Sequence, residues 1–543
     1  MAAIRSLRLP ALIGGGVVAA SYVVFLANLL VSYPTGTDAV SYHFPKALRW
    51  LQEGSLRIPT SKEWHFSLPG NAEIPMMVLL GTGWQALATL PQVLGAVVLS
   101  LASYRIATRL GVSPDGAAAA VLILLNIPMI TRQTFSGYID LYGGSFIVAA
   151  VALFLARHDE LDRPPASWLL PGRLAVCGLA CGIALGAKPT FYVYSALFWL
   201  GAVGVSLAER ARHRIPVKTV ASAMLVAILL PGIFWFGRAV SATGNPLYPV
   251  KVEVKGYTIF DGYDARTQIG IGDQHWVRSR SEWIIYPWTE WNRFGSSYGT
   301  GTGLGAAFAT FVPLGVLSAL AGMVFWRSGG AGVQPFLTAA LLVGGLVWWF
   351  AMGRMLRFTI PLIACACALT APLLDRLLSY RPVAVGGLLV LSLATTSLIA
   401  AFEPAHSLLG RARIWNWTRA VFYGVPAIVD EFPRGSCVLN AGDFFNNFGL
   451  AGKYLSNRIL TLYESPERLT EEFIYARGVD YVVKTGIPDE NDRVLAAMGA
   501  KLVFDDAHVL LGGGIDNPWR IWHVGRPPDP PGTGGPTRRG CFE

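Results

Sequence analysis

The sequence predicts a polytopic α-helical membrane protein that carries a C-terminal α/β domain. Of its 543 residues, 53% are hydrophobic and only 14% are charged, a balance that excludes both a disordered chain and an ordinary soluble enzyme. Apolar runs of roughly 20 residues, the length that spans a bilayer, recur along the first three quarters of the chain. After about residue 405 the runs shorten to strand length, which indicates a change from membrane helices to a folded domain.

About eleven of these runs are long enough to span the membrane. They lie near 11–32, 87–104, 115–130, 137–156, 168–187, 190–208, 217–237, 303–326, 335–352, 358–378 and 382–402. The first run follows Arg5 and Arg8, as a signal peptide would, but it ends without a small-residue cleavage site. We therefore interpret it as a retained helix, and residues 1–402 as one transmembrane module.

Positive charge between the runs predicts the orientation, because Lys and Arg near helix ends stay preferentially in the cytoplasm. Every second loop is rich in Arg, and these loops lie on the same side as the N-terminus. We expect a multi-pass protein of the cytoplasmic cell membrane, with a cytoplasmic N-terminus and an extracytoplasmic C-terminal domain. This topology explains the net charge of +10, and no continuous basic face indicates a nucleic-acid partner.

Two long segments are expected on the outer side. In the first outer loop, 33–86, the stretch AVSYHFPKALRWLQEG at 39–54 has the pattern of an amphipathic helix on the membrane surface. Its predicted polar face consists of Lys46, Arg49 and Glu53. A second interfacial helix is expected after Gly70, and the other long segment is the large outer loop 238–302.

The C-terminal part alternates short apolar runs with polar helical stretches, which predicts an extracytoplasmic α/β domain over 403–524. The expected strands are CVLN (437–440), DYVVK (480–484), KLVF (501–504) and WRIWHV (519–524). The last segment, 525–543, is rich in Pro, Gly and Arg and is predicted to be a disordered tail. The cysteines predict neither a disulfide framework nor a metal site: Cys177, Cys181, Cys365, Cys367, Cys437 and Cys541.

The strongest candidate for chemistry lies just after the first helix, where Asp38 is followed one turn later by Tyr42 and His43. An acid a few residues outside the membrane can accept the proton of an alcohol that reaches the membrane surface. The alternative is that Asp38 only caps the helix at 39–54, because Asp is a good N-cap residue.

Further ionisable residues lie at the outer ends of later helices, where topology favours no cations. They are the acid Asp140 and the cations Lys188, Arg354 and Arg357. We expect them to converge with Asp38 on one cavity, in which the acids handle a hydroxyl and the cations hold a phosphate. The alternative for each cation is that it extends to lipid head groups or caps a helix C-terminus.

The large outer loop contains HWVRSRSEWIIYPWTEWNRFG, in which Trp283 and Trp288 are interleaved with charged residues. Aromatic planes with polar edges suit sugar rings, and they equally suit a lipid interface. His65 and His275 have no companion at metal-ligand spacing, so neither predicts a metal site.

On these residues the sequence resembles the GT-C superfamily of membrane glycosyltransferases, in particular the bacterial enzymes related to the protein mannosyltransferase and lipid A aminoarabinose transferase group. The resemblance covers most of residues 1–402 and depends on the order of five motifs along the chain. They are TDAVSYHFPKALRWLQEG, SGYIDLYGG, GIALGAKPTF, GNPLYP and RMLRFTIPLIACACAL.

The resemblance implies an inverting transfer of a sugar from a polyprenyl-phosphate donor to an extracytoplasmic hydroxyl. It implies that Asp38 is the general base and that Lys188 and Arg357, with Arg354, hold the donor phosphate. Several members of the superfamily carry two adjacent acids in the first loop, whereas here Asp38 is followed by Ala39. The role of the second acid falls to Asp140 or is missing, and a divalent metal is for this reason not favoured. We expect no cofactor, and we expect Tyr42, His43, Trp283 and Trp288 to bind substrate.

Two other functions remain open from the sequence. A transporter or flippase of a lipid-linked sugar would show paired halves and broken helices near the bilayer midplane, and we predict neither from this sequence, whose polar residues cluster at one face. A non-catalytic membrane scaffold would tolerate replacement of Asp38 and Lys188. The expected partners are the lipid-linked sugar, membrane lipids and an acceptor that is a glycan, a lipid or a protein; the sugar itself and a diphosphate donor stay undetermined.

Overall fold

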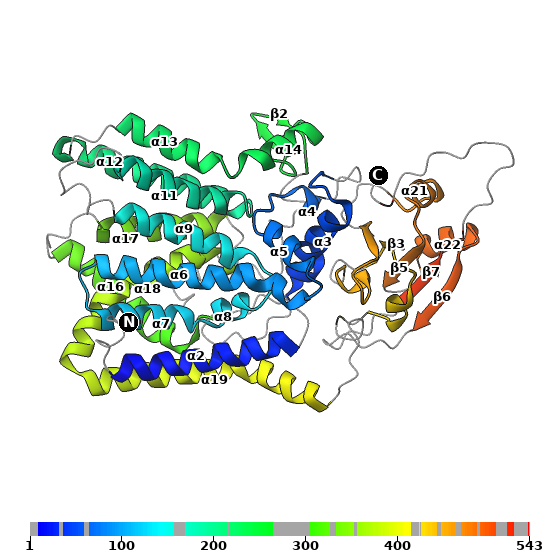
Figure 1. Cartoon of the computed structure of the whole chain (residues 1–543). Helices are drawn as coiled ribbons and strands as arrows, with labels where there is room; N and C mark the ends of the chain where they lie inside the picture. The colour runs from blue at the N-terminus through cyan, green and yellow to red at the C-terminus, as the bar shows by residue number, and fades with distance from the viewer. Residues whose placement is uncertain are drawn as a thin grey trace.

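The computed structural model describes most of the chain. The described residues are 9–31, 36–58, 64–156, 169–213, 217–263, 303–325, 333–351, 356–413, 423, 425–442, 447–462, 468–485, 489–506, 519–525 and 541. They form a helical bundle, a group of short helices at one end of it, and a small sheet domain beyond those helices (Figure 1). This arrangement confirms the predicted fold class.

Helices lie at all eleven predicted positions, and in two of these the helix is broken. The bundle helices are α2 (Leu9–Val31), α6 (Leu90–Arg109), α7 (Pro114–Leu125), α8 (Pro128–Thr134), α9 (Asp140–Leu155), α11 (Leu169–Leu185), α12 (Thr190–His213), α13 (Val217–Leu229), α14 (Ile233–Thr243), α16 (Gly305–Phe325), α17 (Val333–Ala351), α18 (Ile360–Tyr380) and α19 (Pro382–Arg413). Within the described residues, 6 helices are long and apolar enough to cross a membrane, or 7 if α7 and α8 count as one bent span.

Proline explains both breaks. The axes of α7 and α8 differ by 72°, and Pro128 begins the second of the two helices. The helices α13 and α14 are separated at 230–232, where Pro231 lies. Proline lacks the amide hydrogen and disfavours the helical conformation of the residue before it, so each helix ends there.

The first outer loop folds into short helices between the bundle and the sheet domain (Figure 1). They are η1 (Ala39–His43), α3 (Phe44–Glu53), α4 (Trp64–Ser67), α5 (Glu73–Leu80) and η2 (Gln85–Thr89). The predicted amphipathic surface helix is wrong in one respect, because Lys46 and Arg49 on its polar face are only 1% and 3% exposed. Other parts of the chain cover that face: Arg49 lies over the ring of Phe66, and Trp50 stacks on Trp235.

In the large outer loop the structure describes a small antiparallel hairpin. Its strands are β1 (Val252–Val254) and β2 (Tyr257–Phe260). The remainder of that loop, including the predicted substrate-binding Trp283 and Trp288, lies outside the described residues.

The C-terminal domain contains a five-stranded sheet in the order β4-β3-β5-β7-β6. The strands β3 (Cys437–Asn440), β4 (Arg458–Thr461) and β5 (Tyr481–Thr485) are parallel, whereas β6 (Lys501–Asp506) and β7 (Trp519–His523) add an antiparallel edge. The short helices η5 (Ala427–Glu431), η7 (Gly449–Ala451), α21 (Glu471–Ala476) and α22 (Glu490–Ala497) connect them. Strands were expected at 437–440, 480–484, 501–504 and 519–524; β4 was not.

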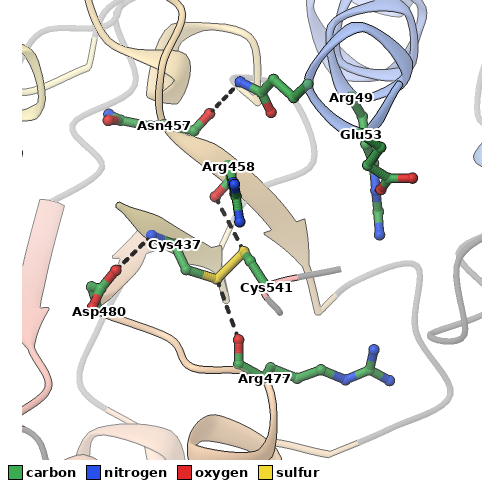
Figure 2. Close-up of a disulfide and its surroundings, with 9 residues drawn as sticks. Arg49, Glu53, Cys437, Asn457, Arg458, Arg477, Asp480 and Cys541 are labelled. Carbon is green, nitrogen blue, oxygen red and sulfur yellow. Dashed lines mark hydrogen bonds and ion pairs between the residues drawn. A yellow bond between two sulfur atoms is a disulfide. The ribbon is translucent and has the colours of Figure 1, made fainter. Parts of the chain in front are cut away.

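A disulfide corrects two predictions: that the cysteines form no disulfide, and that the tail 525–543 is disordered to its end. Cys437 on β3 is bonded to Cys541, 104 residues later, and Figure 2 shows this bond beside β4 and Asp480. The spacing of these cysteines gave no signal for the pair, because the fold rather than the sequence brings them together. The tail is therefore not free to its end, since Cys541 is buried; 526–540 lie outside the described residues.

The sheet domain and the first outer loop share one hydrophobic core. Phe44 at the start of α3 packs against Phe448, with 5.1 Å between the ring centroids. Further along α3, Gln52 donates hydrogen bonds to the carbonyls of Leu455 and Asn457, at 2.9 and 3.1 Å. The segment that follows Asp38 is thus enclosed between the bundle and the C-terminal domain.

Candidate active site

Asp38 is held at the start of a wide helical turn. Gly36, with a φ of 118°, lets the chain reverse after α2, and the π-helix η1 begins directly after Asp38. The side chain of Asp38 makes no capping hydrogen bond, so the alternative that it only caps the helix is wrong. Instead its Oδ2 accepts a hydrogen bond of 2.9 Å from the hydroxyl of Tyr42.

The structure brings Asp38 together with three other predicted site residues, which we call the four-charge cluster: Asp38, Asp140, Lys188 and Arg357. Arg357 Nη2 lies 3.0 Å from Asp38 Oδ2, and Lys188 Nζ lies 2.9 Å from Asp140 Oδ1. Two longer contacts close the ring, 3.8 Å from Lys188 Nζ to Asp38 Oδ2 and 3.7 Å from Arg357 Nε to Asp140 Oδ2. The predicted convergence of these four residues is therefore confirmed as geometry.

The fold supplies each member from a separate element. Asp140 begins α9, Lys188 lies in the turn between α11 and α12, and Arg357 lies in η4 (Leu356–Thr359) before α18. The side chain of Asp140 is fully buried, whereas those of Asp38, Lys188 and Arg357 keep 15%, 10% and 8% of their surface exposed. The cluster is thus nearly enclosed, and Asp38 is its most accessible member.

Opposite charges determine the protonation of Asp38. Burial alone would raise the pKa of Asp38, but Arg357 and then Lys188 favour the charged form, assisted by the hydrogen bond from Tyr42. The net result is a pKa of Asp38 well below its ordinary value. At neutral pH the carboxylate is therefore ionised.

Aromatic rings that the sequence did not single out support the two cations. The guanidinium of Arg357 lies 5.2 Å from the ring of Tyr138 and 5.4 Å from that of Phe358. Lys188 Nζ lies 5.2 Å from the ring of Phe358. Such contacts attract cations and fix their side chains. Tyr138 lies in SGYIDLYGG, the motif that contains Asp140, and Phe358 lies in RMLRFTIP, the motif that contains Arg357.

A second buried group lies on the other side of η1. Glu73 Oε1 is 2.9 Å from His43 Nδ1 and 2.7 Å from Lys46 Nζ, and all three side chains are almost fully buried. Burial would raise the pKa of Glu73, but Lys46 and His43 outweigh it and bring the pKa to about 2. Sequence reasoning missed Glu73, although it is the only charged residue of the helix EIPMMVLL, which was a usable signal.

Of the other predicted site residues, Tyr42 and His43 lie beside two acids, Asp38 and Glu73. Tyr42 bonds Asp38 and stacks on His65 at 4.0 Å, while His43 bonds Glu73, so both contact acids inside the fold. Arg354 lies outside the described residues. In the part of the chain that the structure describes, no group of three or more His, Cys, Asp or Glu side chains is placed to hold a metal ion.

Comparison with known proteins identifies the fold. No family model matches the sequence, and no curated protein matches it. The structure is similar to ArnT from Cupriavidus metallidurans bound to undecaprenyl phosphate, with 16% identity over 93% of this chain and 97% of that chain and a TM-score of 0.59. It is also similar to the archaeal oligosaccharyltransferase AglB from Archaeoglobus fulgidus in complex with an inhibitory peptide and a dolichol-phosphate. There the identity is 11% over 87% of this chain and 69% of that chain, with a TM-score of 0.50.

At such low identity these similarities establish the fold alone, and the chain shares the fold of these two proteins.

Proposed function

We propose that this protein is a membrane glycosyltransferase that moves a sugar from a polyprenyl-phosphate donor to an acceptor hydroxyl, with inversion at the sugar carbon. The observation that carries the proposal is the four-charge cluster, in which two cations and two acids face one another at the end of the bundle. Two proteins of the same fold were solved with a polyprenyl or dolichol phosphate, which supports a lipid phosphate as the ligand of the cations.

Donor binding would change the partners of the cations. The donor phosphate is an anion, and Lys188 and Arg357 can turn from the aspartates to its oxygens. Because Arg357 is the main cation that lowers the pKa of Asp38, this exchange returns the pKa of Asp38 towards its ordinary value. Binding of the donor therefore makes the base available, and Asp38 becomes a better proton acceptor only when the sugar is present.

The acceptor oxygen forms a bond to the anomeric carbon while the bond from that carbon to the phosphate oxygen breaks. Asp38 takes the hydroxyl proton, and the polyprenyl phosphate leaves with one additional negative charge. Lys188 and Arg357 stabilise that charge, which develops only as the bond breaks, so their contribution lowers the barrier rather than merely binding the donor. Asp140, fully buried beside Lys188, keeps the lysine in place.

We further propose that the four-charge cluster and the C-terminal domain lie on the extracytoplasmic side of the cytoplasmic membrane. The charge pattern of the loops favours this orientation, and the disulfide between Cys437 and Cys541 supports it, because such bonds form in oxidising compartments. After denaturation without reductant, a thiol reagent should label the four other cysteines and reach all six only once reductant is added. Labelling of all six cysteines after denaturation without reductant would show that Cys437 and Cys541 are reduced, which would contradict the proposed compartment.

The transfer itself is tested with purified protein in lipid. A radiolabelled polyprenyl-phosphate sugar and crude envelope extract as acceptor should give free polyprenyl phosphate with wild type. With Asp38→Asn the rate should fall about 10³-fold, the range expected for loss of a general base. Arg381→Gln, at the opposite end of the bundle, serves as the matched charge-loss control and should keep the wild-type rate. Full activity of Asp38→Asn at equal protein level would remove Asp38 as the base.

A further inference from the structure

A proline removes a backbone donor from the helix that follows Asp38. The amide of Phe44 donates to the carbonyl of Ala39, five residues back, as a π-helix requires. The carbonyl of Val40 therefore does not receive the Phe44 amide, which would be its donor in an α-helix. The next residue, which would be its donor in a π-helix, is Pro45, and proline has no amide hydrogen to donate. The same proline is the residue four positions after Ser41, so it also removes the α-helical donor of that carbonyl.

The C-terminal domain provides donors to both carbonyls. The amide of Phe448 donates to the carbonyl of Val40 at 2.8 Å. The side chain of Asn447 donates through Nδ2 to the carbonyl of Ser41, also at 2.8 Å. A buried carbonyl without a donor costs about 1–3 kcal/mol, so these two bonds complete the turn that carries Tyr42 and His43.

The two donors are themselves fixed. Asn447 is fully buried, and its Oδ1 accepts a hydrogen bond of 2.7 Å from Asn440 at the end of β3. This bond leaves the Nδ2 of Asn447 pointing to Ser41 and identifies which amide atom is the donor. The ring of Phe448 packs on Phe44, which lies against Gly137 just before Asp140. The contact therefore joins the sheet, the turn after Asp38 and the segment that leads to the second acid.

We propose that the C-terminal domain is part of the catalytic apparatus: Asn447 and the Phe448 amide are positioning groups that hold the turn after Asp38 in its π-helical form. The proposal rests on the proposed function, in which Asp38 is the base. One residue corresponds to about 100° of rotation around a helix, so a return of this turn to α-helical bonding would swing Asp38 away from Arg357 while α3 stayed in place. The domain thus determines where the base points, without touching substrate.

The first test is hydrogen exchange on the full-length protein in lipid nanodiscs, which needs no substrate. Asn447→Asp keeps the acceptor for Asn440 and replaces the donor to Ser41 by an oxygen. We expect the amides of Val40 and Phe44, which close the turn, to exchange about tenfold faster, with strands β3 and β5 unchanged. Gln52→Leu is the matched control, because it removes hydrogen bonds to Leu455 and Asn457 across the same interface but away from the turn.

A second variant covers the case in which Asn447→Asp fails to fold. Pro45→Ala restores a backbone amide that can reach the carbonyl of Ser41 or Val40 from within the helix. In an otherwise wild-type chain this change should let the turn adopt α-helical bonding, which makes the new amide at position 45 slow to exchange and lowers the turnover number. Combined with Asn447→Asp it should restore most of the lost amide protection, since the helix then provides its own donor.

Kinetics distinguish positioning from a general loss of structure. Lys188 and Arg357 lie on other elements, so Asn447→Asp should lower kcat about tenfold and change KM for the lipid donor less than twofold. Unchanged exchange and unchanged kcat in Asn447→Asp, or an equal effect of Gln52→Leu, would overturn the proposal. Absence of turnover in wild type would instead contradict the proposed function, while the exchange experiment would still report on the turn.

Discussion

Two ion-pair clusters in this molecule have the same composition, two aspartates with one lysine and one arginine, but opposite construction. The first is the four-charge cluster near the first outer loop. The second, which we call the Lys484 cluster, lies in the sheet domain and consists of Lys484, Asp489, Asp492 and Arg520. Their difference indicates which one is built to exchange its partners for a ligand.

In the Lys484 cluster the carboxylates hold a helix start. Asp489 and Asp492 form the capping box of α22, in which each side chain accepts a backbone amide of the other residue. Trp522 donates a further hydrogen bond to Asp492, at 3.1 Å, while Arg520 Nε lies 3.6 Å from Asp492 and makes no hydrogen bond among the described residues. These carboxylates are committed to the start of a helix, so the cluster stabilises the local fold.

The four-charge cluster is not saturated. Among the described residues, Asp140 Oδ2 and Arg357 Nε have no hydrogen-bond partner, and their mutual distance of 3.7 Å is too long for one. The carboxylates of this cluster are bonded to the side chains of Tyr42, Lys188 and Arg357, which can turn to another partner, and not to backbone amides of a helix start. The comparison teaches that composition alone does not identify a site; the groups that hold the carboxylates do.

Removing one arginine from each cluster tests most directly whether the two clusters differ in role. Arg357→Met should lower kcat/KM for the lipid donor about 10³-fold, because the lost cation stabilises charge that develops on the leaving phosphate. Arg520→Met, the matched change in the Lys484 cluster, should alter kcat/KM of the folded protein less than threefold. Polyprenyl phosphate release is the measurement. Equal losses in both variants would mean that the two clusters do not differ in role.

Stability should respond in the reverse order. Lys484→Met removes the buried cation of Asp492, whose other cation, Arg520, lies 3.6 Å away, and should destabilise the sheet domain by about 1–3 kcal/mol. Lys188→Met should cost less, because Arg357 still contacts both aspartates of the four-charge cluster. Chemical denaturation followed by hydrogen exchange in β5 and β7 checks this order for Lys484→Met, and amides of η1 and α9 check it for Lys188→Met. A greater loss with Lys188→Met would reverse the assignment of the structural cluster.

The pH dependence should be flat over the neutral range. The pKa of Asp38 lies below its unfolded value, so its ion pairs stabilise the fold above about pH 4 and are lost as the pH falls through the lower, folded pKa. Asp492 follows the same sign, because burial is outweighed by Lys484 and the Asp489 amide. We expect kcat/KM to change less than twofold between about pH 8 and pH 6. An acidic limb with a midpoint near neutrality would identify a base other than Asp38.

A further prediction concerns how packing positions the first cluster. A Cβ at Gly137 would lie 2.3 Å from the Phe44 ring and 2.6 Å from Ala39 Cβ, so Gly137→Ala must displace the turn after Asp38. We expect kcat to fall about tenfold with little change in donor affinity. Gly387→Ala is the control, because the added methyl in α19 meets no atom within 4 Å. Wild-type kcat for Gly137→Ala would show that the turn tolerates this displacement.

The sequence was sufficient to predict the fold class and to single out the four charged residues that the fold brings together. Membrane spans follow from the length of apolar runs, and an ionisable residue at the outer end of such a run is detectable because it is costly there. Asp38, Asp140, Lys188 and Arg357 each carry that signal. Their convergence could be predicted from the common outer side, although their pairing could not.

What the sequence did not indicate depends on long-range packing. Lys46 and Arg49 fit the polar face of a surface helix, and only the cover provided by Phe66 and Trp235 makes them interior. Tyr138 and Phe358 support cations through their position in space, and aromatic residues near a membrane interface are too common to stand out. Cys437 and Cys541 pair because the sheet places them together.

The most direct test of the account is the affinity of the purified protein for polyprenyl phosphate, measured for wild type and Asp38→Asn in the same lipid. Asp38 competes with the phosphate for Arg357 and Lys188. Removing its charge should therefore tighten lipid phosphate binding about tenfold, even though the same variant loses transfer. Weaker or unchanged binding in Asp38→Asn would contradict the claim that these cations exchange the aspartates for the donor phosphate.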